Sequence, residues 1–204
     1  MKDDAESQRI IEIEIDVKYW TQSLPTAAQV RPGRCLGCGA PGVELGGTVV
    51  LHGHGVRGRS RWGPGESGET PEKGTLPQRR YECQRCGAVL VVRPRGVVRH
   101  RRYSAAAIVL ALWLWSGGKQ SDPEVREQVC VRAPSGVSRP ERWTTLRRWA
   151  KAARDGALLS NVVGSRDWTL RACAERAARV VAALADATIV EPAMRAFAGA
   201  AHAR

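Results

Sequence analysis

Two cysteine turns with identical spacing constrain this chain more than any other feature. They read CLGCG at residues 35–39 and CQRCG at residues 83–87. Brought together, the turns supply four thiolates at the corners of a tetrahedron, which suits a Zn²⁺ ion with Zn–S distances of about 2.3 Å. Gly39 and Gly87 can take a positive φ, which lets backbone N–H groups point at the sulfur atoms. We therefore predict one structural zinc ion with four ligands, Cys35, Cys38, Cys83 and Cys86.

The two cysteine turns lie far apart in the chain. They are separated by 44 residues, which is longer than the common spacing of such sites. Residues 63–74, GPGESGETPEKG, have the composition of a surface loop and account for the extra length. Unmetallated thiols and a redox pair are the alternatives. Four cysteines leave no open coordination position, so a zinc enzyme is not expected.

The two halves of the chain differ in composition. Residues 31–100 are rich in Gly, Pro, Arg and Val, whereas residues 104–204 are rich in Ala, Leu, Arg and Trp. We predict an α+β protein in which a small β zinc ribbon precedes an all-α, trihelical module like a helix-turn-helix, followed by a C-terminal helix. The expected segments are an N-terminal strand and linker (1–32), the ribbon (33–102), the helix-turn-helix-like domain (103–156) and a C-terminal helical segment (157–204).

Strands are expected mainly before residue 94. Residues 10–18 alternate apolar and charged side chains, as a half-buried strand does. Residues 48–51 and 56–62 predict a hairpin joined through His52-Gly53-His54-Gly55, and residues 78–81 and 88–93 predict a second hairpin around the second cysteine turn. The two histidines of the first turn could contact solvent, phosphate or metal, and the sequence leaves this open.

Helices are expected from residue 104 onward. Ser104 caps a buried helix at 105–115, and Ser121 begins a capping box for a helix at 123–131. A third helix is expected at 141–154 and a last one at 167–187. Small residues in the last helix suit either packing against the trihelical unit or a homodimer contact. Cys130 and Cys173 are expected to be buried hydrophobes.

The third helix is the candidate reading element for DNA. Trp143, Leu146, Ala150 and Ala153 recur at helical spacing and are expected to pack inward. The opposite face carries the candidate groove contacts, namely Thr144, Arg147, Arg148 and Lys151. The alternative is a helical bundle with a solvated charged face.

Charge points to a polyanionic partner. The formal net charge is +12, and residues 57–102 hold twelve Lys or Arg against four Glu. An arginine-rich run at 93–102 offers further contacts with a phosphate backbone, from Arg93, Arg95, Arg99, Arg101 and Arg102. The alternatives are a solvated linker and an arginine-rich composition that only solubilises the surface. The sequence does not distinguish DNA from RNA.

Several strings of this chain resemble a known group of proteins. CLGCGAPG, LHGHGVRGR, RRYECQRCGAVLVVRPRGVVRHRRYS and WTTLRRW, within residues 33–154, are similar to bacterial zinc-ribbon proteins of mobile elements and to the DNA-binding front end of insertion-sequence transposases. The resemblance implies binding of element ends or regulatory DNA, with the four cysteines as zinc ligands. The fifty or so residues after 154 are too few for a catalytic fold with an acidic triad. We therefore expect a non-catalytic DNA-binding protein that acts as an accessory or regulatory factor, with catalysis supplied by a partner polypeptide. The alternative is a zinc-ribbon module that docks onto a protein of a transcription or recombination complex.

Membrane insertion and secretion are not expected. The first residues contain no apolar signal segment, and the longest apolar run, 105–115, is too short to span a bilayer. A reducing cytoplasm suits free or metal-bound thiols.

Overall fold

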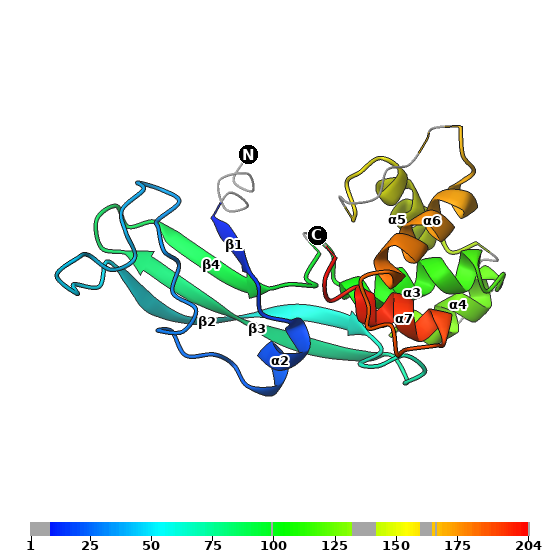
Figure 1. Ribbon diagram of the computed structural model, residues 1–204, viewed down its shortest axis with the longest axis horizontal. Coiled ribbons are helices and arrows are strands. Elements are labelled where there is room, and N and C mark those ends of the chain that lie inside the picture. The colour runs from blue at the N-terminus through cyan, green and yellow to red at the C-terminus, as the bar shows by residue number, and fades with distance from the viewer. Residues whose placement is uncertain (1–8, 99, 132–141, 160–164, 166, 204) are drawn as a thin grey trace. The chain divides into compact units, whose positions relative to one another are not determined.

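A computed structural model describes residues 9–98, 100–131, 142–159, 165 and 167–203 (Figure 1). These residues form a mixed α/β fold with a four-stranded sheet and six helices. The predicted architecture, a small zinc ribbon followed by an all-α module, is wrong. The N-terminal strand joins the same sheet as the strands around the second cysteine turn, a helix lies between strands in the chain order, and Cys83 belongs to a long strand.

The sheet has the strand order β1-β4-β3-β2. Its strands are β1 (Ile10–Ile13), β2 (Leu51–Gly63), β3 (Glu72–Cys83) and β4 (Val89–Pro94). Strand β1 pairs in parallel with β4, with Ile10 opposite Val91, and β3 pairs antiparallel with β4, with Tyr81 opposite Leu90. The predicted hairpin around the second cysteine turn is confirmed.

The histidine–glycine stretch does not form a turn. The hairpin expected from strands at 48–51 and 56–62 is wrong, because a single strand, β2, begins at Leu51 and runs through His52 and His54, and residues 48–50 precede it. Gly55 has a φ of 82°, which L side chains rarely adopt, and so places an irregularity inside the strand instead of ending it. Alternation of glycine with histidine therefore gave a false turn signal.

The strand predicted at 10–18 also ends early, because a helix begins within it. Asp16 accepts a hydrogen bond from the Lys18 N–H at 2.5 Å and caps helix α2 (Val17–Gln22). Trp20 of this helix is fully buried, and its Nε1–H donates to the Pro77 carbonyl at 2.5 Å. The helix is thereby fixed to strand β3.

The chain divides into two compact units, each made of segments that are distant in sequence. One unit contains the described residues up to Arg59 together with Thr75–Arg95, and the other contains Ser60–Gly74 and the described residues from Gly96 onward. In the first unit, the segment after α2 is fixed to β3: Arg79 Nε donates to the Pro25 carbonyl at 2.9 Å, and the Tyr81 hydroxyl donates to the Ala27 carbonyl at 2.8 Å. This segment leads directly into the first cysteine turn.

The second unit holds the remaining helices. They are α3 (Ala105–Ser116), α4 (Asp122–Val129), α5 (Thr144–Arg154), α6 (Leu170–Ala182) and α7 (Pro192–Gly199). Helix α3 is apolar on nearly every side and is buried against the other four. The predicted first helix is confirmed, and the Ala107 N–H donates to the Ser104 hydroxyl at 3.1 Å, as a cap requires.

The other helices differ from the prediction at their ends. The expected start of the third helix, Glu141, lies outside the described residues, and α5 begins at Thr144. The prediction of a single last helix at 167–187 is wrong, because α6 ends at Ala182 and a further helix, α7, follows. Glu191 caps α7, since its carboxylate accepts a hydrogen bond from the Ala193 N–H at 2.9 Å. Within the ranges that the structure describes, each helix is too short or too polar to cross a membrane.

Candidate metal centre

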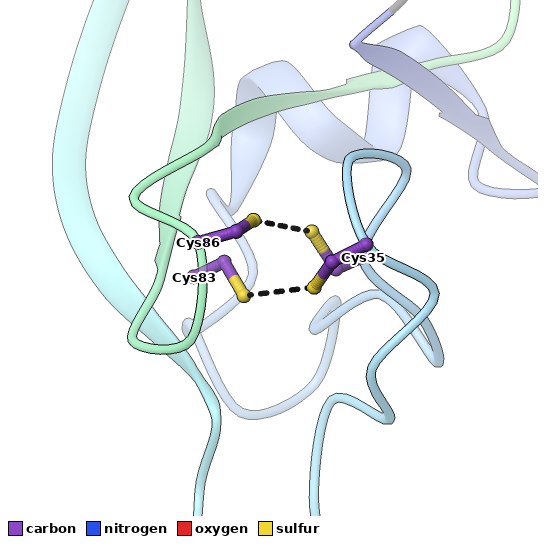
Figure 2. A group of neighbouring side chains, drawn as sticks. Cys35, Cys83 and Cys86 are labelled. Atoms are coloured by element: carbon purple, nitrogen blue, oxygen red, sulfur yellow. Dashed lines mark hydrogen bonds between the residues drawn. The ribbon is translucent and has the colours of Figure 1, made fainter.

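The four cysteines of the two turns lie together in the first unit (Figure 2). Cys83 is the last residue of β3, Cys86 lies in the turn that leads to β4, and Cys35 and Cys38 come from the loop before β2. The Sγ atoms lie within 4.8 Å of one another. The sulfur atoms of Cys35 and Cys86 are 3.7 Å apart, as are those of Cys38 and Cys83.

This spacing fits a tetrahedral ion. With metal–sulfur bonds of about 2.3 Å, the corners of a regular tetrahedron are about 3.8 Å apart. The Cys35–Cys86 and Cys38–Cys83 sulfur–sulfur distances, 3.7 Å each, agree with that edge. The cluster can therefore hold a metal ion through four thiolates.

The two turns have the same backbone structure. In each, the N–H of the first cysteine donates to the carbonyl of an alanine five residues later, and the N–H of the glycine donates to the carbonyl of the first cysteine. The pairs are Cys35–Ala40 and Gly39–Cys35 in one turn and Cys83–Ala88 and Gly87–Cys83 in the other, at 2.8 to 3.0 Å. Gly39 and Gly87 have φ values of 73° and 68°, so the predicted positive φ after each second cysteine is confirmed.

Gly37 allows the two turns to approach closely. A Cβ atom at this position would lie 2.9 Å from the Ala88 Cβ and 3.3 Å from the Cys86 Sγ. Both neighbours belong to the opposite turn, so a side chain here would separate the cysteine pairs. The glycine is therefore required for packing around the sulfur atoms.

Backbone N–H groups donate hydrogen bonds to the sulfur atoms and affect the pKa values of the thiols. The Gly37 N–H donates to the Cys35 Sγ at 3.3 Å. Burial raises the pKa of Cys83, but hydrogen bonds from the Arg85 and Cys86 N–H groups, together with those to the Cys35 and Cys86 side chains, lower that pKa to about 7. The Ala88 N–H lowers the pKa of Cys86, yet hydrogen bonding with the neighbouring cysteines and burial raise it to about 12. Metal ligands are deprotonated thiolates, so binding of an ion would displace the thiol protons that the cysteines use to hydrogen-bond with one another.

The two histidines do not join the cluster. His52 Nε2 lies 2.9 Å from the Val49 carbonyl, and His54 Nδ1 lies 3.1 Å from Glu82 Oε2. Among the described residues, the metal-ligating group consists of the four cysteines alone.

The described arginines of the run at 93–102, which begins in β4, have partners within the protein. Arg93 is 5% exposed, and its Nη2 lies 3.0 Å from Glu12 Oε2, while Arg95 forms an ion pair with Glu14. These arginines belong to the first unit, and Arg101 and Arg102 belong to the second. The guanidinium carbon of Arg102 lies 5.1 Å from the centroid of the Trp62 ring, Arg101 is partly buried, and Arg99 lies outside the described residues.

The predicted contacts on the third helix all lie on α5. Thr144, Arg148 and Lys151 are exposed, whereas Arg147 is partly buried and forms an ion pair with Asp122. Asp122 is the first residue of α4, and it also accepts the Trp143 N–H at 2.6 Å. Trp143, Leu146, Ala150 and Ala153 are buried, so the predicted inward face is confirmed.

Three residues of this region were not singled out from the sequence. Asp122 fixes the start of α5, Trp149 is buried beside the predicted apolar stripe, and Trp115 at the end of α3 contacts Arg147. Trp149 was detectable, because it lies three residues after Leu146 on the same helical face. Asp122 could not be detected from the sequence. An acidic residue at the start of a helix is already explained by the capping box, so nothing in the sequence indicates that it has a partner on another helix.

Comparisons with protein families, with curated proteins and with solved structures find no match to this chain. Its function therefore has to be argued from the chemistry of its own residues.

Proposed function

We propose that this is a zinc-dependent, non-catalytic DNA-binding protein. In this proposal the four-cysteine ion stabilises the first unit, and the exposed face of α5 contacts duplex DNA. The observation that carries the proposal is the division of α5 into a buried apolar face and an exposed basic one.

Helix α5 has no acidic residue to balance its basic side chains. Its sequence is TTLRRWAKAAR, with Leu146, Trp149, Ala150 and Ala153 buried. Arg148 and Lys151 are exposed, and no acid forms an ion pair with either of them in the part of the chain that the structure describes. Exposed cations that form no ion pair attract a polyanion, and the net charge of +12 adds a long-range contribution.

The exposed face is also held in place. Asp122 accepts the Trp143 N–H at the start of α5 and pairs with Arg147 one turn later, which fixes the helix against α4. A fixed helix loses less conformational entropy on binding than a mobile one. On this face, Lys151 suits a phosphate, Arg148 suits a phosphate or a guanine edge, and Thr144 suits a phosphate or a thymine methyl group.

Zinc is the proposed occupant of the sulfur cluster. Four sulfur ligands in a tetrahedron are typical of Zn²⁺ and of iron–sulfur centres, and zinc serves purely structural sites. Elemental analysis of the purified protein should find one zinc per chain. Stoichiometric iron with visible absorption would contradict the zinc assignment and leave the DNA-binding proposal to its own test.

The DNA-binding proposal is tested by the dependence of affinity on salt. Fluorescence anisotropy with a labelled duplex should give a log–log slope of about −0.9 for each phosphate neutralised. Arg148→Gln and Lys151→Gln should each reduce the steepness by about one phosphate. Arg176→Gln is the matched control, because Arg176 is an exposed arginine on α6. A wild-type slope near zero would contradict DNA binding.

Protein docking is the second candidate function. Leu36 lies inside the first cysteine turn, and Val43 and Leu45 follow it. All three side chains are exposed, Leu45 fully. Exposed apolar side chains beside a metal-held turn suit a protein partner. Affinity for that partner would depend weakly on salt and would fall on Leu45→Ser, whereas Arg148→Gln would leave it unchanged. A role at mobile elements, with catalysis by a partner polypeptide, stays a prediction from the sequence resemblance.

A further inference from the structure

Two arginines from different helices meet one tryptophan ring in the second unit. The guanidinium carbon of Arg147, on α5, lies 5.4 Å from the centroid of Trp115, and that of Arg171, on α6, lies 5.0 Å from it. Trp115 is 5% exposed, so its ring is fixed by the surrounding core. One buried ring therefore holds two positive charges together.

The two arginines differ in how their charge is balanced. Arg147 pairs with the buried carboxylate of Asp122. Arg171 is exposed, and no ion pair joins it to an acid within the described ranges. A cation–π contact orients a guanidinium while its charge and its N–H donors remain available.

The dipole of α6 does not favour a cation at Arg171. It is the second residue of α6, whose first turn contains no acid. A cation in the first turn lies at the positive end of the helix dipole, which is unfavourable. The same position is favourable when an anion binds there, because the arginine and the helix end then attract the same charge.

We propose that Arg171 contacts a phosphate of the bound DNA and that Trp115 positions its guanidinium for this contact. The DNA-contacting surface then extends from the exposed face of α5 to the first turn of α6. Helices α5 and α6 pack against each other, which fixes the position of one relative to the other. This inference rests on the proposed function, and it adds a second helix to the interface.

The expected contact is with the sugar–phosphate backbone. A guanidinium presents a planar fork of N–H donors that matches two phosphate oxygens. A backbone contact fixes position without reading sequence. Loss of Arg171 should therefore weaken binding to all duplex sequences equally, whereas loss of a base-reading side chain on α5 would change sequence preference.

Four proteins test this inference on the full-length chain: wild type, Arg171→Gln, Arg171→Lys and Arg176→Gln. Circular dichroism first shows that each variant is folded. With labelled duplex DNA, Arg171→Gln should reduce the steepness of the log–log salt dependence by about 0.9 and weaken binding several-fold at low salt. Arg171→Lys should keep the wild-type slope but bind more weakly, because an ammonium lacks the planar fork. Arg176→Gln should match wild type in slope.

The outcomes separate this inference from the proposed function. Wild-type protein that binds duplex DNA with salt dependence, together with an unchanged slope for Arg171→Gln, would overturn the Arg171 assignment alone. An equal loss for Arg176→Gln would overturn it as well, since overall charge would then explain the effect. Absence of salt-dependent binding by wild type would overturn both proposals.

Discussion

The sulfur atoms of Cys38 and Cys83 are 3.7 Å apart, although the residues are separated by 45 positions in the chain. Cys35 and Cys86 repeat this relationship at the same distance. Each of these pairs joins one turn to the other, so each turn contributes both of its cysteines to the contact between the segments. The loop that carries Cys35 and Cys38 is otherwise fixed to strand β3 through contacts such as that of Tyr81 with Ala27.

Cys83→Ser should release the metal and unfold much of the first unit. A hydroxyl is a far poorer ligand for a soft metal site than a thiolate, and structural zinc contributes apparent binding free energies of about 10–16 kcal/mol. Helix content should persist, because α3 to α7 belong to the other unit. Elemental analysis and far-ultraviolet circular dichroism measure both effects.

Cys130→Ser is the control for this prediction. Cys130 is outside the sulfur cluster, and its sulfur accepts a hydrogen bond from the Tyr103 hydroxyl at 3.2 Å, a role that serine can take. Its metal content should equal that of wild type. Equal metal content in Cys83→Ser and wild type would show that the cluster does not bind the ion.

Gly37→Ala should weaken metal binding even though every ligand remains. The added Cβ would lie 2.9 Å from the Ala88 Cβ, so the turns must separate, and overpacking of this kind costs about 1–3 kcal/mol. Competition with a chelator should show about 5-fold to 150-fold weaker affinity. Gly46→Ala is the matched control, because its added Cβ has no neighbour within 4 Å. Equal affinities for the two variants would contradict the packing argument.

Asp122→Ala should destabilise the second unit by about 1–3 kcal/mol, because the Trp143 N–H would lose its acceptor in a buried position. The change also leaves Arg147 without its ion pair, although that side chain is partly solvated and adds little. Thermal unfolding measures the loss. Asp122→Asn keeps an acceptor for the N–H and should lose less; if both variants unfold like wild type, Asp122 does not fix α5.

Glu124→Gln should remove a pH-dependent contribution to stability at the start of α4. Hydrogen bonds from the Ser121 hydroxyl and N–H, both 2.7 Å from Glu124 Oε2, lower the pKa of this carboxyl. Because the pKa is lowered, the charged carboxylate stabilises the folded state. This contribution is lost as the pH falls through the folded-state pKa, which lies below the ordinary value of 4.5. Wild type should therefore exceed the variant in stability at neutral pH and converge with it in acid. A constant difference across this range would contradict the capping role.

Short-range chemistry made part of the fold predictable. The cap at Ser104, the positive φ values of Gly39 and Gly87 and the buried stripe of α5 each depend on residues within a few positions of one another. The metal cluster was predictable because the duplicated cysteine turn has few other uses.

Long-range pairing explains the errors. Nothing local indicates that β1 pairs in parallel with β4, because such pairing is decided by packing on the whole sheet. The stretch from His52 to Gly55 has the composition of a turn, yet pairing with β3 keeps it in a strand. The ion pair between Arg147 and Asp122 joins two helices, and no helical periodicity could reveal it.

Because the two cysteine turns meet, the chain between them forms a closed loop, and β2 and β3 make up most of its length. The entropic cost of closing a flexible loop rises only with the logarithm of its size, by about 0.6 kcal/mol for each doubling. Residues 64–71 connect the two strands at the far end of this closed loop. Insertions between these residues would lengthen the closed loop at little cost in conformational entropy, while the four sulfur atoms keep their geometry.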